Sequence, residues 1–330
     1  NRLYRAVANR AIGILTNSLL SECEFRGTSR IRASGRAGLN DQAANHVDLR
    51  AEGVDAVCRG VAVDRFGFDL AVRGRTNIVS GLEAVICSGK LRGGGFFRTA
   101  PTGGETGGYY RVEGSLRGAE FGRVARMLDR SGSRDYEGRM EADFEFEGVP
   151  GRGDSVRGKG RLRVDDGRVF MLPVFGPLSN QLGKLIPGLN FVLAQSDARS
   201  DFVLAEGAAH SEKIVIDGDI LSLTGRGSYH FDRELDFHAQ VRLMKEHTLV
   251  SRLLRALTYP ISKLFEFRLR GTLREPKWYP VHFSSDMLER LGLQAAEPVR
   301  GESVRDETPL PPAGNAKRDA EEKVPSESGQ

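Results

Sequence analysis

Three polar residues in the second half of the chain are the nearest approach to a catalytic or metal-binding set. His230, Asp232 and His238 lie close together in the sequence, and imidazole and carboxylate groups are common acid–base catalysts and metal ligands. Alternation along a strand would place His230 and Asp232 on one face, whereas a turn would separate both from His238. We therefore interpret all three as surface polar residues, with no metal or acid–base role.

The three cysteines give no recognisable site either. Cys23, Cys58 and Cys87 are widely spaced, odd in number and unaccompanied by histidine at a ligand spacing. This arrangement predicts neither a zinc site nor a disulfide framework.

Glycine clusters and hydroxyl residues also lack the context that chemistry requires. The glycines at 93–95 and the "GGETGG" at 103–108 have no adjacent Lys-Ser/Thr pair of a phosphate-binding loop, so we interpret both as flexible turns. No serine stands in a nucleophile elbow, and no carboxylate pair stands apart from the solvent-facing rows. The sequence therefore predicts a protein that is not an enzyme and uses no metal or cofactor.

The elements that would carry these residues are one-sided strands. In "RMEADFEFEG", at 139–148, Met140, Phe144 and Phe146 alternate with carboxylates, so apolar and charged side chains take opposite faces of the strand. The same alternation recurs between residues 46 and 270, and it is typical of antiparallel sheets with one solvated face. The predicted apolar lining consists of Phe144, Phe146, Leu162, Val164, Leu235, Phe237, Val241, Phe267 and Leu269.

The segment 158–187, "GKGRLRVDDGRVFMLPVFGPLSNQLGKLIP", predicts a hairpin followed by a helix. Its Asp-Asp-Gly at 165–167 suits a tight turn, with residues 169–172 as the return strand. The helix would begin at Pro177 and end before Pro187. Further short helices are expected near the start of the chain, over 121–128 and before Pro260. The predicted helical cap of the sheet carries Leu178, Leu182, Leu185, Leu249, Leu253 and Leu257.

So few helices cannot cover so many apolar strand faces, so the sheet must stack, close or curl on itself. The pattern leaves two alternatives open, a packed sandwich and a curled sheet that lines an apolar groove. Residues 296–330 hold few large apolar side chains and are predicted to be a disordered tail. No apolar run is long enough for a membrane-spanning helix, and no signal peptide is visible.

Charge adds little to the choice of partner. The chain has 48 basic and 44 acidic residues, interleaved along the strands. A net charge of +4 permits weak attraction to anionic lipid without requiring it. Aromatic and basic side chains fall on opposite faces of the strands, whereas single-stranded nucleic acid needs both on one surface. We therefore expect no nucleic-acid binding.

Residues 110–283 resemble the C-terminal region of the AsmA-like family, which is related to the bridge-like lipid transfer proteins. The resemblance lies in "GKGRLRVDDG" followed by a Leu-Pro helix, in "YRVEGSLRGAEFGRVARMLDRSGSRDYEGRMEADFEFEG", and in the closing "GTLREPKWYP". Residues 1–109 share only the general strand pattern of the family and none of these motifs. The implied organisation is an N-terminal helix and sheet region (1–109), an AsmA-like β-groove with helical caps (110–295) and the tail (296–330).

The resemblance implies a non-enzymatic protein of the bacterial cell envelope, on the periplasmic side. Its groove would shield the acyl chains of phospholipids during transport between membranes or outer-membrane biogenesis. Its partners would be the inner or outer membrane surface and other envelope proteins, with inner-membrane anchoring through a segment absent from this chain. The alternative is a structural or adhesive β-scaffold with a packed core and no lipid cargo. An enzyme acting on envelope glycans is a third alternative that lacks an acid–base pair.

Overall fold

The structure is a computed structural model that describes residues 23–36, 38, 42–58, 60–100, 108–128, 136–185, 195–243 and 264–281. The chain divides into two compact units, Asn1–Ala296 and Glu297–Gln330. All described residues belong to the first unit. The predicted disordered tail lies outside the described residues.

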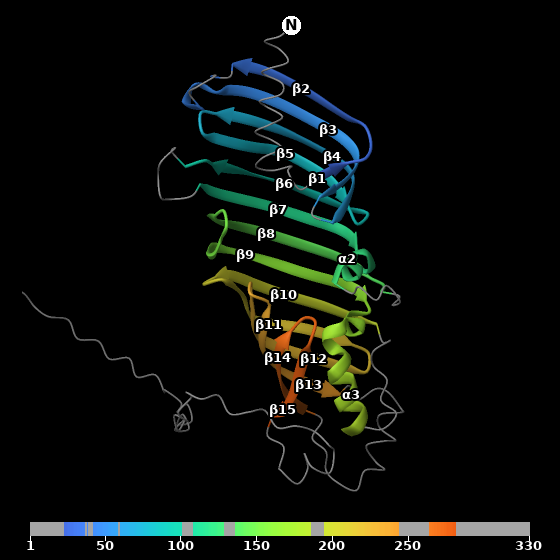
Figure 1. Cartoon of the computed structure of the whole chain (residues 1–330). Coiled ribbons are helices and arrows are strands. Elements are labelled where there is room, and N and C mark those ends of the chain that lie inside the picture. The colour runs from blue at the N-terminus through green and yellow to red at the C-terminus, as the bar shows by residue number, and fades with distance from the viewer. Residues whose placement is uncertain are drawn as a thin grey trace, which may run out of the picture. The chain divides into compact units, whose positions relative to one another are not determined.

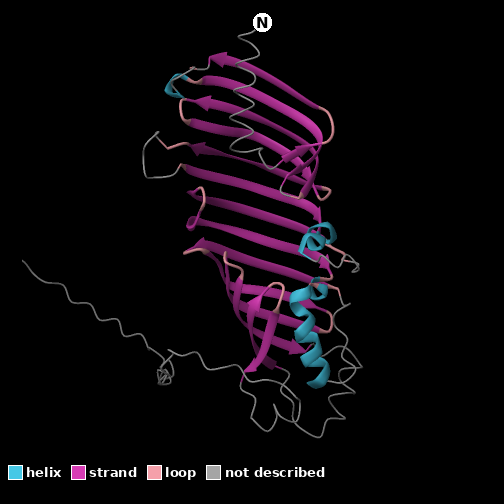
Figure 2. Cartoon of the chain, viewed as in Figure 1, coloured by secondary structure: helices cyan, strands magenta, loops and turns pink. Residues whose placement is uncertain are grey.

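One large antiparallel sheet forms the first unit (Figures 1 and 2). From β3 to β15 every strand pairs with the next in the sequence, and β1 and β2 both pair with β3. Among the described strands, β15 pairs only with β14, so the sheet is open. The strands are β1 (Cys23–Phe25), β2 (Ser29–Arg36), β3 (His46–Cys58), β4 (Val61–Arg73), β5 (Thr76–Ile86), β6 (Gly89–Arg98), β7 (Tyr109–Glu120), β8 (Arg139–Val149), β9 (Arg152–Gly167), β10 (Ser196–Ala205), β11 (Ala208–Gly218), β12 (Leu221–His230), β13 (Glu234–Leu243), β14 (Leu264–Thr272) and β15 (Pro276–Val281).

Helices are few and short, as expected. Among the described residues they are α2 (Phe121–Leu128), α3 (Gly176–Leu185) and the single 3-10 turns η1 (Gln42–Ala44), η2 (Val169–Met171) and η3 (Pro173–Phe175). The predicted mainly β class, an extended antiparallel sheet with a few short helices, is confirmed. None of the described helices is long and apolar enough to cross a bilayer.

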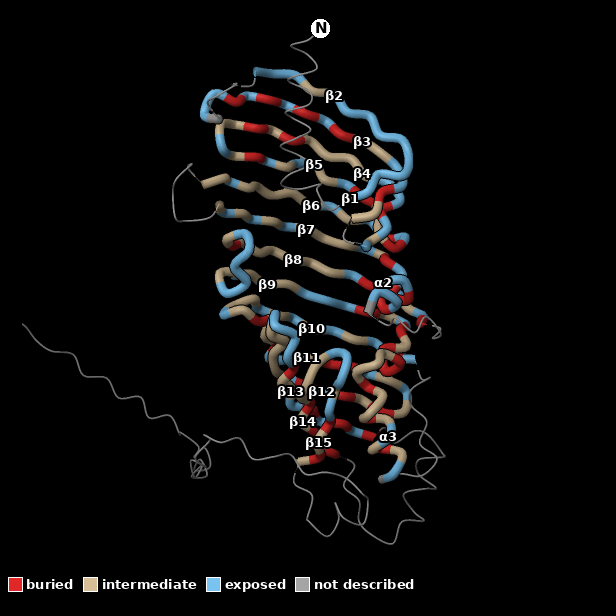
Figure 3. The backbone as a smooth tube through the Cα atoms, in the orientation of Figure 1, coloured by how far each residue is buried: buried red, intermediate tan, exposed pale blue. Residues whose placement is uncertain are grey.

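The register keeps the apolar residues of successive strands in line. Phe146 lies opposite Val112 on β7 and Gly158 on β9, and Leu49 lies opposite Leu70 on β4. We call the surface formed by these residues and their in-line neighbours the apolar face, and the opposite surface the charged face. Figure 3 shows the resulting alternation of buried and exposed residues along β3. The alternation in the sequence thus predicts which side of each strand faces inward.

The predicted hairpin at 165–167 is wrong. β9 continues to Gly167, where it pairs with β10, which follows α3 in the sequence. Residues 169–171 form η2 because Val169, Phe170 and Met171 are all buried, whereas a strand with one solvated face buries only alternate residues. The side chain of Ser196 also accepts a hydrogen bond from the Val169 N–H at 3.1 Å, which removes that donor from strand pairing.

The sheet runs without a break across residue 109. Strand β6 pairs with β7 along its whole length, from Lys90 opposite Arg117 to Arg98 opposite Tyr109. The boundary drawn from the resemblance therefore does not coincide with a break in the sheet. The glycines at 93–95, which we expected to form a turn, lie inside β6.

The largest buried cluster among the described residues lies where the helices meet the sheet. It joins α2, η2, η3 and α3 to the apolar face from β7 to β15. Phe170, Leu178, Leu182, Leu221, Val241 and Phe267 are its largest fully buried side chains. The C-terminal strands therefore have a packed core.

Candidate functional site

Three phenylalanines form a row on the apolar face in the middle of the sheet. Phe144 and Phe146 project from β8 and Phe202 from β10, and all three are only partly buried. None of them belongs to the buried clusters of the described residues. We call these three residues the aromatic platform.

Glycines make room on the sheet for two of the platform rings, those of Phe144 and Phe202. Phe144 lies between Gly114 on β7 and Gly160 on β9. A Cβ atom added at Gly114 would stand 2.6 Å from Cζ of Phe144, and one added at Gly160 would clash with the Phe202 ring. Each ring therefore occupies the place that a side chain on the neighbouring strand would take.

Ring contacts extend the platform toward β7. The centroids of the Phe144 and Phe146 rings are 5.9 Å apart, and Phe146 meets Tyr110 edge-on at 6.2 Å. Both separations lie in the range at which aromatic pairs attract each other. The result is a continuous aromatic surface across neighbouring strands.

The predicted lining divides into an uncovered and a packed part. Phe144 and Phe146 are half-buried and Leu162 is 37% exposed, whereas the half-buried Phe237 packs against the large cluster. The other predicted lining residues are buried in the large cluster and contact protein rather than an open surface: Val164, Leu235, Val241, Phe267 and Leu269. All nine residues nevertheless share the apolar face, because the register carries it through every strand from β8 to β14.

Helix α3 belongs to the packed part. Leu178 and Leu182 are fully buried, and Trp278 Nε1 on β15 donates a 2.7 Å hydrogen bond to the Val174 carbonyl just before the helix. The Gln181 side chain in turn donates to the carbonyl of Trp278. Leu185 ends α3 without a described side chain, and the predicted cap residues Leu249, Leu253 and Leu257 lie outside the described residues.

The charged face carries cross-strand ion pairs. Arg161 Nε lies 2.8 Å from Asp201, Arg117 reaches Asp143 at 2.5 Å, and Arg268 binds Asp236 through two nitrogen atoms at 2.9 and 3.0 Å. The pKa of Asp236 is lowered, mainly by the hydrogen bond from Arg268. Most of these pairs are solvent-exposed, so each contributes little to stability.

A hollow of about 1100 Å³ spans β6 to β11. Phe144 and Phe202 contribute to its lining, but most of the lining residues are polar or charged and lie on the charged face, among them Lys159, Arg161 and Asp201. This hollow is therefore not the apolar groove that we expected. On β8 to β10 the uncovered apolar surface is the platform and its neighbours, and further exposed apolar side chains, Phe25 and Ile31, lie on the apolar face of β1 and β2.

The histidines with potential chemistry are not brought together into a site. His230, at the end of β12, lies 3.2 Å from Ser228 Oγ, and Asp232 accepts the Glu234 N–H in the following turn. His238 lies on β13 opposite Arg226 and Arg268. Within the described residues there is no cluster of His, Cys, Asp or Glu that could hold a metal ion.

The cysteines differ from the sequence-based interpretation. Cys58 is disulfide-bonded, and its partner in the β1–β3 register is Cys23. Cys87 is a free, buried thiol whose pKa is raised mainly by burial. Spacing alone does not reveal this disulfide, because only the pairing of β1 with β3 makes the two positions neighbours.

Comparisons of the chain with protein-family models, with curated proteins and with solved structures found no match. The resemblance to the AsmA-like family therefore stays a prediction from the sequence motifs.

Proposed function

We propose that this chain holds phospholipid acyl chains against the aromatic platform and so takes part, without catalysis, in lipid transport or outer-membrane biogenesis. The observation that supports this most directly is the platform itself, three partly exposed phenylalanines on the apolar face of β8 and β10. Covering apolar surface stabilises a complex by about 25 cal/mol per Å². Contiguous exposed apolar patches commonly mark binding surfaces.

The shape of the platform suits an extended apolar ligand. The rings of Phe144 and Phe202 lie over glycines, and the neighbouring apolar-face residues Val112, Leu116 and Leu162 carry no charge. An acyl chain has no polar atoms that need hydrogen-bond partners, so an uncharged apolar surface is sufficient to bind it. An unpaired charge there would cost several kcal/mol.

The disulfide supports a location outside the cytoplasm. Disulfides persist in oxidising compartments such as the bacterial periplasm and are rare in the cytosol. The bond at Cys58 is therefore consistent with the envelope location that the resemblance implies.

A packed scaffold is the alternative that a specific observation favours. From β11 to β15 the apolar face is buried under α3 and the 3-10 turns, as in a structural core. If the protein is a scaffold, the platform should be packed in the same way and be covered by protein rather than by lipid.

Site-specific photo-crosslinking in cells distinguishes the two functions. A photoreactive residue is placed singly at Phe144, Phe146 or Phe202, and the matched controls are placed at Ile78 or Val203. Both controls are large apolar residues, 40% and 53% exposed, that the register assigns to the charged face.

Lipid holding predicts phospholipid adducts at the three platform positions and none at the two controls. Adducts at all five positions would indicate nonspecific proximity to a membrane. Protein adducts at the platform without lipid adducts would establish the scaffold and overturn the proposal.

A further inference from the structure

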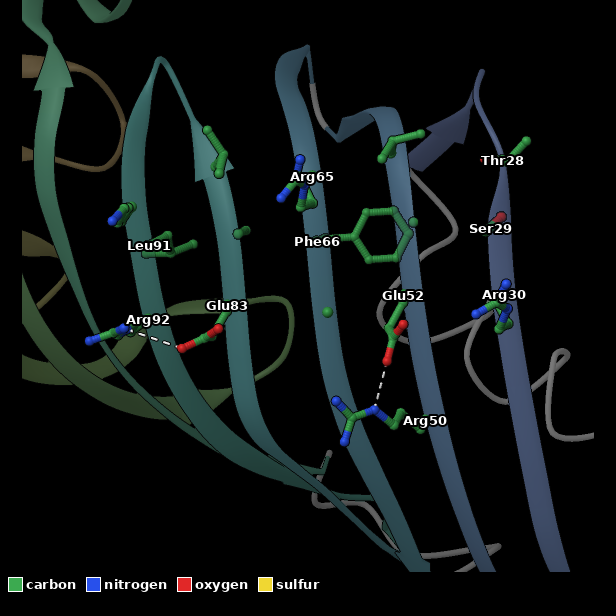
Figure 4. A pocket seen from close by; sticks show the side chains of 16 residues that line it. Thr28, Ser29, Arg30, Arg50, Glu52, Arg65, Phe66, Glu83, Leu91 and Arg92 are labelled. Carbon is green, nitrogen blue, oxygen red and sulfur yellow. Dashed lines mark hydrogen bonds and ion pairs between the residues drawn. The ribbon is translucent and has the colours of Figure 1, made fainter.

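A second, smaller hollow lies at the N-terminal end of the sheet. It has a volume of about 680 Å³ and is lined by residues of β2 to β6, together with Thr28 just before β2. Figure 4 shows its labelled side chains on neighbouring strands. Most of its lining residues lie on the charged face, opposite the apolar rows.

The lining of this hollow is strongly basic. It contains five basic and two acidic residues, a net charge of +3 in a chain whose total is +4. The hollow over β6 to β11 has four basic and five acidic lining residues, a net charge of −1. The excess of positive charge is therefore a property of the first hollow and not of the whole charged face.

Both acidic residues are already neutralised within the hollow. Glu52 pairs with Arg50 at 2.8 Å, and Glu83 pairs with Arg92 at 3.2 Å (Figure 4). The hydrogen bond from Arg50 is the main cause that lowers the pKa of Glu52, so this carboxylate stays ionised and bound to its partner.

Two cations, Arg65 on β4 and Lys90 on β6, have no counter-ion among the described residues, whereas Arg30 on β2 lies close enough to Glu52 to help lower the pKa of that carboxylate. Arg65 and Lys90 both lie opposite Val85, which β5 places between them. Neighbouring strands are about 4.8 Å apart, so the two cations flank an uncharged position at about 10 Å from each other. An anion above Val85 would lie between both.

We propose that this hollow binds a phosphate-bearing anion, either a phospholipid headgroup or free phosphate. Guanidinium and ammonium groups are the side chains that proteins use to bind phosphate. Thr28, which also lines the hollow, can add a hydroxyl as a hydrogen-bond donor. This inference goes beyond the proposed function and does not depend on it, because the hollow and the platform lie on opposite faces.

Two double variants of the full chain test the proposal. Arg65→Gln/Lys90→Gln removes two unpaired cations from this hollow and retains side-chain length. Lys159→Gln/Lys213→Gln removes the same charge from the hollow over β6 to β11 and serves as the matched control. All four residues are exposed, so both variants are expected to fold.

Binding is measured by co-sedimentation with phosphatidylcholine vesicles that contain or lack phosphatidylglycerol, and by calorimetry with inorganic phosphate. Each cation near an anionic surface strengthens binding about fivefold. The first variant should therefore bind phosphatidylglycerol vesicles about 25-fold more weakly than the wild type, and the control should match the wild type at equal ionic strength.

The results separate the two sources of phosphate. A loss confined to vesicles identifies a lipid headgroup, and a loss confined to inorganic phosphate identifies a free anion. Equal losses in both variants, or no binding of either probe by the wild type, would overturn the proposal. Crosslinking at Phe144 reports independently on the platform.

Discussion

Phe144 and Gly114 lie opposite each other on neighbouring strands, and the ring of Phe144 occupies the space that a side chain at position 114 would fill. A methyl group at Gly114 would approach Cζ of Phe144 to 2.6 Å, so the ring would have to turn away. We expect Gly114→Ala to destabilise the protein by roughly 1–3 kcal/mol, the usual cost of overpacking. In a Phe144→Leu background the same substitution should cost much less, because the clashing atom is gone. Urea unfolding of the four proteins measures this coupling.

Gly158 provides the contrast to Gly114. A Cβ atom there would stand 2.6 Å from Cβ and 2.7 Å from Cα of Phe146, so the obstacle includes backbone that no side-chain change removes. Gly158→Ala should therefore stay destabilising in a Phe146→Leu background. Rescue at Gly158 as large as that at Gly114 would show that backbone is not the obstacle at Gly158.

The Asp236–Arg268 pair makes stability depend on acid pH. Since the bound Arg268 lowers the pKa of Asp236 in the folded state, the pair stabilises the fold above the unfolded aspartate pKa of about 3.9. That contribution is lost as the pH falls through the lower, folded value. Asp236→Asn should lower the free energy of unfolding by about 1 kcal/mol at pH 7, and the difference from the wild type should shrink below about pH 4.

Asp201→Asn is the control for this prediction. Asp201 also pairs with an arginine, but its side chain is 77% exposed, against 42% for Asp236. Its replacement should change stability by less than about 0.5 kcal/mol at any pH, because exposed pairs contribute little. If the free energy of unfolding of the two variants depends on pH in the same way, the partial burial of Arg268 does not strengthen its ion pair with Asp236.

At the scale of elements, α3 is part of the core rather than a removable lid. Leu182 is fully buried in the cluster that also contains Phe267 and Trp278. Leu182→Ala should destabilise the protein by roughly 2–5 kcal/mol, as truncation of buried leucines does. Asn180→Ala, an exposed position on the same helix, should change stability by less than about 0.5 kcal/mol. Thermal unfolding measures both, and a mild Leu182 variant would support a lid.

The same elements show how far the sequence predicts the structure. Strict alternation predicts the facing of Phe144 and Phe237, and the apolar stripe predicts α2 and α3, because both are local patterns with a physical period. The return strand predicted after Gly167 is wrong because the consecutive apolar residues of this segment suit a buried turn as well as a strand. Distinguishing them requires the long-range pairing of β9 with β10.

Two features of the site could not be predicted from one sequence. Phe202 joins the platform only because β10 lies beside β9. The basic hollow requires the register of β2 to β6, since its unpaired cations are far apart in the sequence. Burial also could not be assigned, because the alternation that gives Phe144 and Val241 the same face does not say which one a helix covers.

At the scale of the whole molecule, the disulfide predicts how many free thiols the protein has. This number indicates whether the protein resides in an oxidising compartment. In denaturant without reductant, protein isolated from its native compartment should react with alkylating agent at one cysteine, Cys87, and after reduction at all three. The folded protein should react slowly, because Cys87 is buried. Mass spectrometry counts the adducts, and three adducts without reduction would contradict the disulfide and weaken the envelope location.

The sheet is continuous, but its burial is uneven along the strand order. The largest buried cluster joins β7–β15 to the helices, whereas the clusters that we describe on β3 to β5 are much smaller. Since local stability follows buried apolar contact, amide hydrogens of β11 to β14 should exchange more slowly than those of β4 to β6.

A charged substitution on the apolar face should have opposite consequences in these two parts of the sheet. Phe144→Arg should fold, because the half-buried position lets the guanidinium reach water. Val241→Asp should unfold β11 to β15, because that position is fully buried and leaves the carboxylate unpaired. Hydrogen-exchange mass spectrometry of the wild type and both variants tests this, and uniform protection with two equally unfolded variants would mean that the platform is packed like the core.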